Sequence, residues 1–120
     1  MILYKGKIIN IGPLVSEFIS AGILVFFGDG APPELVEFSI IHDAKALNDQ
    51  IKTGDFFQIN ENNFQVLAVG EVANKNIESL GHIILKFNGK NKPELPGDVN
   101  LEETELPKIS TGDHFQFFRM

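Results

Sequence analysis

Short apolar segments, separated by turns rich in glycine, proline and asparagine, restrict the fold of this chain more than any other feature. The segments either alternate in polarity or run continuously apolar, which is typical of half-buried and fully buried strands. Gly12-Pro13 and Asn60-Glu61-Asn62-Asn63 interrupt them with residues that favour turns. The sequence predicts strands at residues 2–11, 23–27, 36–42, 56–59, 64–69, 82–87, 98–101 and 114–118.

Helices are predicted to be few and brief. Pro13 suits the first turn of a helix at residues 14–21. Asn74 is expected to cap a second helix that ends at Gly81, and residues 44–51 could add one or two helical turns. Because strands dominate, we expect an all-β fold: a small closed barrel or sandwich of short, mostly antiparallel strands with one or two short helices.

The composition narrows the class of protein. The chain has 120 residues without a linker, so residues 1–120 are expected to form a single domain. It contains no cysteine, which excludes disulfides and thiolate metal sites. No segment resembles a signal peptide or approaches the ~20 apolar residues that cross a bilayer, so we expect a cytoplasmic protein without membrane insertion. The net charge of −6 argues against nucleic-acid binding and suits a basic protein partner or simple solubility.

His42 is the first candidate for a functional residue. If the alternation of Val36, Phe38 and Ile40 continues by one step, the imidazole lies at the end of a strand on its apolar face. Partial desolvation there would lower its pKa and keep the ring neutral and nucleophilic, while the strand end leaves it open to a reactant. The competing interpretation is a structural histidine that hydrogen-bonds a neighbour, and spacing alone favours that role.

His82 is the second candidate, because it begins a predicted strand as His42 ends one. Ends of adjacent strands can lie side by side, and a pair of imidazoles suits phosphoryl transfer, one as nucleophile and one as donor to the phosphoryl oxygens. Little more is required, because that transition state needs mainly positioning and charge stabilisation. Strict alternation, however, places His82 on the face of Lys86, so its ring could instead face solvent.

No metal site is favoured, because the histidines at positions 42, 82 and 114 never form a close pair. An internal similarity also weakens a role for the third histidine. Residues 111–116 (Thr-Gly-Asp-His-Phe-Gln) repeat residues 53–58 (Thr-Gly-Asp-Phe-Phe-Gln), with histidine in the place of Phe56. His114 is therefore predicted to be a packing or surface residue. The chain also lacks a phosphate-binding P-loop and a nucleophile elbow.

Several sequence blocks, taken together, resemble one known family. They are Gly-Ala-Pro-Pro-Glu-Leu at residues 30–35, Ile41-His42, Ala68-Val69-Gly70, Asn-Ile-Glu-Ser-Leu-Gly-His at residues 76–82, Phe87-Asn88-Gly89 and Pro96-Gly97. In order and spacing they are similar to the glucitol/sorbitol-specific IIA component of the bacterial phosphotransferase system. The Leu-Gly-His block combined with the upstream Gly-Ala-Pro is the most specific part of the resemblance.

The resemblance implies a phosphocarrier with a compact β-barrel-like fold. In that family a histidine accepts a phosphoryl group from the phosphocarrier protein HPr and passes it to the IIB domain of a membrane-bound sugar-alcohol permease. The matching position is His42, and His82 matches the family's second histidine, for which we expect a supporting role. No metal or organic cofactor is expected, because the phosphoryl group travels on protein side chains.

Two other classes stay open: a non-catalytic β-barrel binding module, and a regulatory interaction module that uses the same surface without turnover. A deep apolar pocket away from His42 would favour the binding module. Proximity of His42 and His82 in a shallow depression would favour the phosphocarrier.

Overall fold

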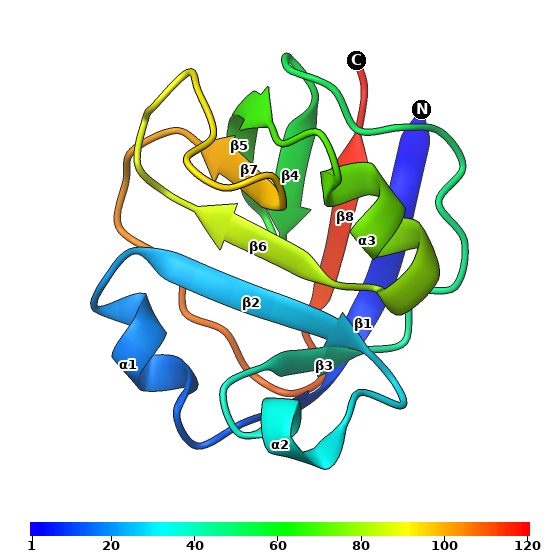
Figure 1. Cartoon of the computed structure of the whole chain (residues 1–120), viewed down its shortest axis with the longest axis vertical. Coiled ribbons are helices and arrows are strands. Elements are labelled where there is room, and N and C mark those ends of the chain that lie inside the picture. The colour runs from blue at the N-terminus through cyan, green and yellow to red at the C-terminus, as the bar shows by residue number, and fades with distance from the viewer.

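The computed structural model describes all of residues 1–120 and contains eight strands and three short helices. The strands close into one barrel in the order β1-β3-β2-β6-β7-β5-β4-β8 (Figure 1). This confirms the predicted all-β fold in its closed form, with one helix more than expected. No helix has the length and apolar character needed to cross a membrane. The elements are β1 (Ile2–Ile11), α1 (Val15–Ile19), β2 (Ile23–Gly28), α2 (Pro33–Val36), β3 (Ile40–His42), β4 (Phe56–Ile59), β5 (Asn62–Val69), α3 (Ala73–Leu80), β6 (Ile83–Lys86), β7 (Asp98–Leu101) and β8 (His114–Phe118).

Most neighbouring strands pair antiparallel, but β2 pairs with β3 and β6 with β7 in parallel. Parallel neighbours need a crossover connection rather than a tight turn. The β2–β3 crossover contains α2 (Figure 1). Helix α3 belongs to neither parallel pair: it connects β5 to β6, which are not neighbours in the barrel, and lies along its outside. In the β2–β3 pair, Gly28 lies opposite His42. The ends of both strands therefore meet at the same edge of the barrel.

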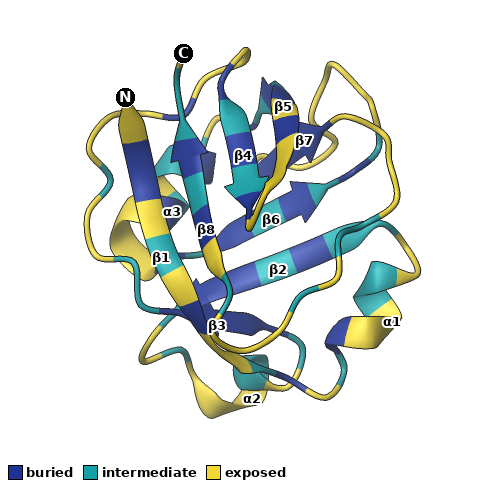
Figure 2. Cartoon of the chain, turned by 180° about the vertical axis from the view of Figure 1, so that it is seen from behind, coloured by how far each residue is buried: buried dark blue, intermediate teal, exposed yellow.

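Alternating side chains fill the barrel interior. Buried and more exposed residues alternate along β4 and β5, as Figure 2 shows. The rings of Phe26, Phe57 and Phe115 meet in the centre, with centroids 5.1 to 6.3 Å apart. Each side chain of this size contributes roughly 1.5–3 kcal/mol when fully buried. Aromatic rings thus occupy the middle of a core that also contains many leucine, isoleucine and valine side chains.

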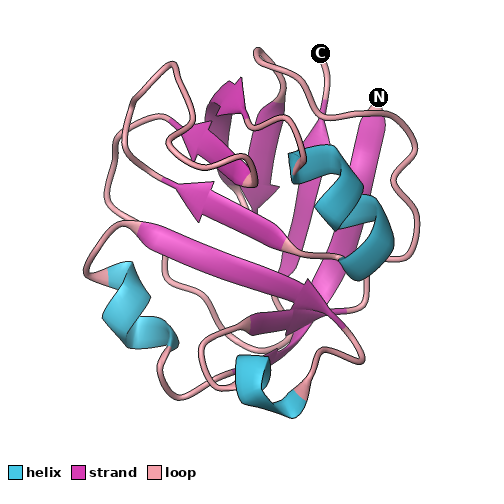
Figure 3. Cartoon of the chain, viewed as in Figure 1, coloured by secondary structure: helices cyan, strands magenta, loops and turns pink.

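The strand predicted at residues 36–42 is wrong in its first half. Helix α2 occupies the region where that strand should begin, and β3 contains only Ile40–His42 (Figure 3). Pro33 supplies the fixed φ of a first helical turn, and Glu34 complements the positive end of the helix. This local chemistry overrides the apparent alternation. His42 nevertheless keeps its predicted place at the end of the strand.

Residues 44–51 form no helix, contrary to the prediction. Their backbone groups find partners elsewhere in the fold. The Ile51 N–H donates to the side-chain oxygen of Asn74 at 2.7 Å, and the Asn74 amide nitrogen donates to the Ile51 carbonyl at 2.9 Å. Asn74 therefore holds this segment against α3 and does not cap the helix, whose N-cap position is Val72.

The two Thr-Gly-Asp sequences form equivalent turns. Gly54 and Gly112 have φ values of +97° and +96°, which glycine adopts without strain. In each turn the aspartate, Asp55 or Asp113, accepts a hydrogen bond of 2.7 Å from the backbone N–H three residues earlier. The turns lead into β4 and β8, which pair with each other. The internal similarity is thus one strand-entry turn used twice.

Candidate functional site

His42 is the last residue of β3, and none of its surface is exposed. Three aromatic rings surround the imidazole. The centroids of Tyr4 and Phe115 lie 5.8 and 5.1 Å away with their rings edge-on, and the centroid of Phe26 lies 6.1 Å away. The sequence predicts a ring that is partly open to a reactant. The structure shows it closed, because the short strand carries the ring into the aromatic core.

Backbone groups bind both ring nitrogens of His42. Nε2 lies 2.8 Å from the carbonyl oxygen of Gly81, and Nδ1 lies 3.1 Å from the backbone nitrogen of Ala44. A carbonyl can only accept a hydrogen bond, and an amide N–H can only donate one. Nε2 therefore carries the proton and Nδ1 the lone pair, which fixes a single neutral tautomer.

Burial lowers the pKa of His42 below its ordinary value of 6.5, because the charged ring would lose its hydration. The bond to Gly81 and the negative charge of Asp43 oppose this shift, and the positive charge of Lys45 adds to it. The net effect favours a neutral ring at neutral pH, which is the form that can act as a nucleophile.

Gly81 brings its backbone directly against the His42 ring. It ends α3 in the left-handed conformation, with a φ of +62°. A Cβ atom there would lie 2.8 Å from the backbone nitrogen of Gly28 and 3.0 Å from His42 Cε1. Glycine alone combines this backbone conformation with so close an approach. The sequence predicts Gly81 as the end of a helix but gives no sign of its contact with His42.

His82 follows this turn, and its half-buried ring stacks on Phe27 with centroids 4.1 Å apart. Its Nδ1 lies 3.3 Å from the Phe26 carbonyl oxygen and donates to it, whereas Nε2 has no hydrogen-bond partner in the protein. Burial lowers the pKa of His82 as well. The ring of His82 thus pairs with Phe27 rather than with His42. The two histidines are linked through the backbone of Gly81.

A cavity of about 450 Å³ opens beside this arrangement. Its walls come from the loop between β2 and α2, the end of α3 and the segment after β3. They include Ala44 and Gly81, whose backbone groups bind the imidazole, and Tyr4, which meets it edge-on. A molecule in this cavity therefore contacts the partners of both ring nitrogens, while the His42 ring itself lies behind them.

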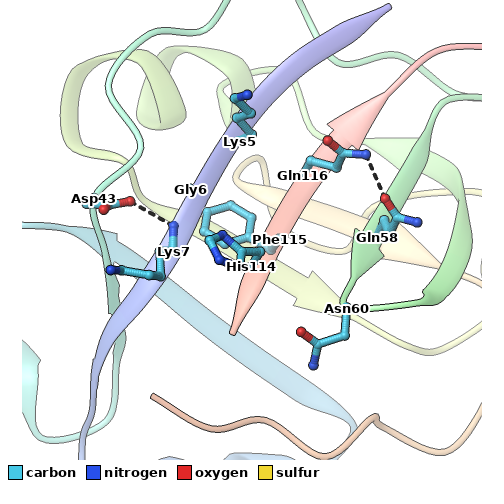
Figure 4. A pocket seen from close by; sticks show the side chains of 9 residues that line it. All are labelled: Lys5, Gly6, Lys7, Asp43, Gln58, Asn60, His114, Phe115 and Gln116. Atoms are coloured by element: carbon cyan, nitrogen blue, oxygen red, sulfur yellow. Dashed lines mark hydrogen bonds between the residues drawn. The ribbon is translucent and has the colours of Figure 1, made fainter. Parts of the chain in front are cut away.

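A larger cavity of about 560 Å³ lies over β1, β4 and β8 (Figure 4). It has a single hydrophobic residue among its nine lining residues, so it is not the deep apolar pocket that would favour a binding module. Figure 4 shows the side chains of Lys5 and Lys7 directed away from each other, and the Asp43 carboxylate accepts the Lys7 backbone N–H at 2.7 Å. His114 lines this cavity and is exposed, as predicted. No cluster of histidine, cysteine, aspartate and glutamate side chains suits a metal ion.

Three residues around His42 are missed by sequence reasoning: Tyr4, Ala44 and Gly81. Ala44 and Gly81 act through backbone groups, which every residue offers, so the sequence does not mark them as partners of His42. Tyr4 is the chain's one tyrosine, and no spacing relates it to His42. Only the closure of the barrel brings β1 beside β3 and so places Tyr4 at the site.

Comparisons with known proteins agree over nearly the whole chain. Residues 3–116 match the family described as the PTS system glucitol/sorbitol-specific IIA component. Proteins named PTS system glucitol/sorbitol-specific EIIA component from Shigella flexneri and Escherichia coli (strain K12) are each 33% identical over 116 residues, covering 97% of this chain and 94% of theirs. A solved structure titled as the PTS system IIA component from Enterococcus faecalis V583 shares the fold, with a TM-score of 0.82 and 24% identity over 95% of this chain and 98% of that one. The chain therefore belongs to the glucitol/sorbitol-specific IIA component family of the phosphotransferase system, and its function is that of a phosphocarrier.

Proposed function

We propose that this protein carries the phosphoryl group on His42, accepting it from phosphorylated HPr and passing it to the IIB domain of a membrane-bound sugar-alcohol permease. The supporting observation is a neutral imidazole, held in one tautomer by two backbone groups whose residues line a cavity. Family membership supplies the class of reaction. In this proposal residues 1–120 act as one cytoplasmic phosphocarrier domain without a metal or organic cofactor.

The transfer exchanges one phosphorus–nitrogen bond for another. The lone pair of a His42 ring nitrogen forms the new bond to phosphorus while the bond to the donor's phosphohistidine breaks. The electron pair of the broken bond returns to the donor imidazole, and water takes no part. Transfer onward repeats the exchange, with the IIB side chain as nucleophile and His42 as leaving group. Positioning and charge stabilisation suffice for such a loose transition state.

The covered ring must first give up one backbone partner. Attack through Nδ1 uses the lone pair already there and requires the Ala44 N–H to turn away. Attack through Nε2 requires the ring proton to move and the Gly81 carbonyl to withdraw. Both residues line the cavity, so a docked partner contacts them directly. A nitrogen-15 correlation spectrum of the phosphorylated protein identifies the nitrogen that carries phosphorus.

We assign His82 the supporting role. Its stacking on Phe27 and its bond to the Phe26 carbonyl fix the ring, and its Nε2 is left without a partner. Because burial lowers the pKa of His82, Nε2 carries a lone pair in the resting protein. In this proposal the negative charge of the phosphoryl group favours protonation of the ring, and Nε2–H then becomes a donor suited to a phosphoryl oxygen.

The intact mass after incubation with phosphoenolpyruvate, enzyme I and HPr tests the proposal. We expect the wild type to gain one acid-labile phosphoryl group and His42→Gln to gain none, since glutamine keeps hydrogen-bonding capacity in the buried site but offers no nucleophilic nitrogen. His82→Phe keeps the stacked ring without its nitrogens and should slow acceptance about 10- to 100-fold, as for a lost hydrogen bond to a charged group.

His114→Ala is the matched control, because it also removes a histidine but at an exposed position. It should accept the phosphoryl group at the wild-type rate. Acceptance by folded His42→Gln would overturn the assignment of the nucleophile. A wild-type protein that gains no mass would overturn the phosphocarrier proposal for this chain.

A further inference from the structure

Tyr4 reaches His42 from the neighbouring strand β1. The pairing of β1 with β8 shifts register between Ile2 and Tyr4, and Leu3 and Tyr4 are both buried although they are consecutive. The Tyr4 ring meets the imidazole at an interplanar angle of 84° and also packs against Phe115. The aromatic core thus fixes the position of Tyr4 beside His42.

The Tyr4 hydroxyl has no hydrogen-bond partner in the protein, which is unusual for a tyrosine with only 2% of its surface exposed. The Tyr4 hydroxyl is nevertheless not fully buried. Asp98 Oδ1 is the one side-chain nitrogen or oxygen atom that is both fully buried and without a hydrogen-bond partner. Tyr4 lines the cavity of about 450 Å³. Its small exposed surface therefore faces that cavity.

A phosphoryl group bonded to His42 would extend into the same cavity. Ala44 and Gly81, which bind the two ring nitrogens, both line it. A phosphoryl group on either nitrogen takes the place of one of these backbone partners. Its oxygens then lie on the cavity side of the imidazole, where Tyr4 has a free hydroxyl.

We propose that the Tyr4 hydroxyl donates a hydrogen bond to an oxygen of the phosphoryl group on His42, which makes Tyr4 a catalytic residue of transfer. This inference rests on the proposed function of His42. Preorganised donors aimed at the charge of the reacting group are among the strongest contributions to catalysis. The bond leaves the proton on Tyr4, and no covalent step passes through the phenol.

Two further properties support this role. Burial raises the pKa of Tyr4 to about 12, so the hydroxyl stays a donor throughout the physiological range. The other hydroxyl in the cavity wall, that of Ser79, already donates to the Lys75 carbonyl at 2.8 Å. Lys45 also lines the cavity, but it is an exposed residue with a long, flexible side chain. Tyr4 is the donor whose position the core fixes.

Tyr4→Phe tests the inference, because it removes only an oxygen that has no partner in the resting protein. We expect an unchanged thermal midpoint and a rate of acceptance from phosphorylated HPr that falls about 10- to 100-fold, as for a lost hydrogen bond to a charged group. The phosphorus-31 resonance of the phosphohistidine should also shift, which a purely structural role of the ring would not cause. Ser79→Ala removes a hydroxyl from the same cavity and should leave both rate and resonance unchanged.

The outcomes separate this inference from the proposed function. If the wild type accepts a phosphoryl group on His42 and Tyr4→Phe matches it in rate and in resonance, the role of Tyr4 is wrong and the phosphocarrier stands. If Ser79→Ala slows transfer as much as Tyr4→Phe, the specific role of Tyr4 is also wrong. If the wild type accepts nothing, both fail together.

Discussion

The His42 imidazole combines full burial with two backbone hydrogen bonds. Removing the partner of a buried polar group costs about 1–3 kcal/mol. The resting site is therefore stable while closed, and a docking protein has to supply interaction energy of that order to open it. A protein that merely collides with the site does not supply this free energy, whereas one that binds the cavity walls does.

The lowered pKa of His42 predicts how stability depends on pH. Between the folded and unfolded pKa values of His42, the unfolded chain binds more protons than the folded chain. The contribution of His42 to the free energy of unfolding is therefore complete well above pH 6.5 and declines as the pH falls below that value. The loss between pH 7.5 and 5.5 increases with the distance by which the folded pKa lies below the unfolded one. His82 adds a loss of the same sign. Urea unfolding at the two pH values measures the change.

His82→Phe serves as the control for this prediction, because it removes one histidine and keeps the His42 environment. The pH dependence should shrink in that variant but persist, and His42→Gln should remove the remainder. A side-chain titration by NMR that places the pKa of His42 at or above 6.5 would contradict the explanation.

At the scale of the secondary-structure elements, the turn from α3 to β6 forms part of the site. Gly81→Ala would place a Cβ against the Gly28 backbone and the His42 ring, in a conformation that alanine adopts at a cost of about 1–2 kcal/mol. We expect a lower free energy of unfolding, by about 1–3 kcal/mol, together with a strong loss of phosphoryl acceptance as the imidazole is displaced. Chemical denaturation and the mass assay measure the two effects.

Gly54→Ala provides a matched comparison, because Gly54 also has a positive φ but faces open space. That variant should lose stability and keep full acceptance. If Gly81→Ala lost stability and nothing else, the close approach to His42 would have no functional weight.

The elements also show what sequence can and cannot predict here. Strand segments such as Phe56–Ile59 and Asp98–Leu101 were predictable, because their residue types and flanking turns all agree. The strand before His42 was mispredicted, since Pro33 starts a helix where the apolar spacing also fits a strand. The position of His42 was predictable, but its backbone partners were not, because hydrogen bonds between distant segments depend on barrel closure.

At the scale of the whole molecule, the closed barrel depends on β8, which pairs with both β1 and β4. Arg119, directly after β8, binds the buried Asp55 carboxylate through two nitrogens at 2.8 and 3.1 Å. It also reaches Asp49 and the Gln50 carbonyl. The bonds to Asp55 and Asp49 raise the pKa of Arg119, and the hydrogen bonds from the Gln50 backbone N–H and from Arg119 lower the pKa of Asp49. One side chain thus connects the end of β8 to the turn before β4.

Arg119→Ala should therefore lower the thermal midpoint clearly, because it leaves the buried carboxylate of Asp55 without its charged partner. Arg119→Lys should have an intermediate effect, since lysine keeps the charge but cannot form the paired bonds. Lys90→Ala removes an exposed ion pair with Glu94 and should change little. Equal midpoints for all three variants, measured by circular dichroism, would show that Arg119 does not stabilise the barrel.

The enclosure of His42 also bears on how long a phosphoryl group can be stored. A phosphorus–nitrogen bond is lost to hydrolysis whenever water reaches it in a suitable direction. In the resting protein the aromatic rings and the Gly81 turn leave the His42 imidazole no exposed surface. A phosphoryl group on His42, as proposed above, displaces one backbone partner of the ring, and its phosphorus then lies on the cavity side of the imidazole. The lifetime of the phosphorus–nitrogen bond is therefore set by how far the cavity walls restrict the approach of water to phosphorus, and a docked partner that fills the cavity protects the bond during transfer.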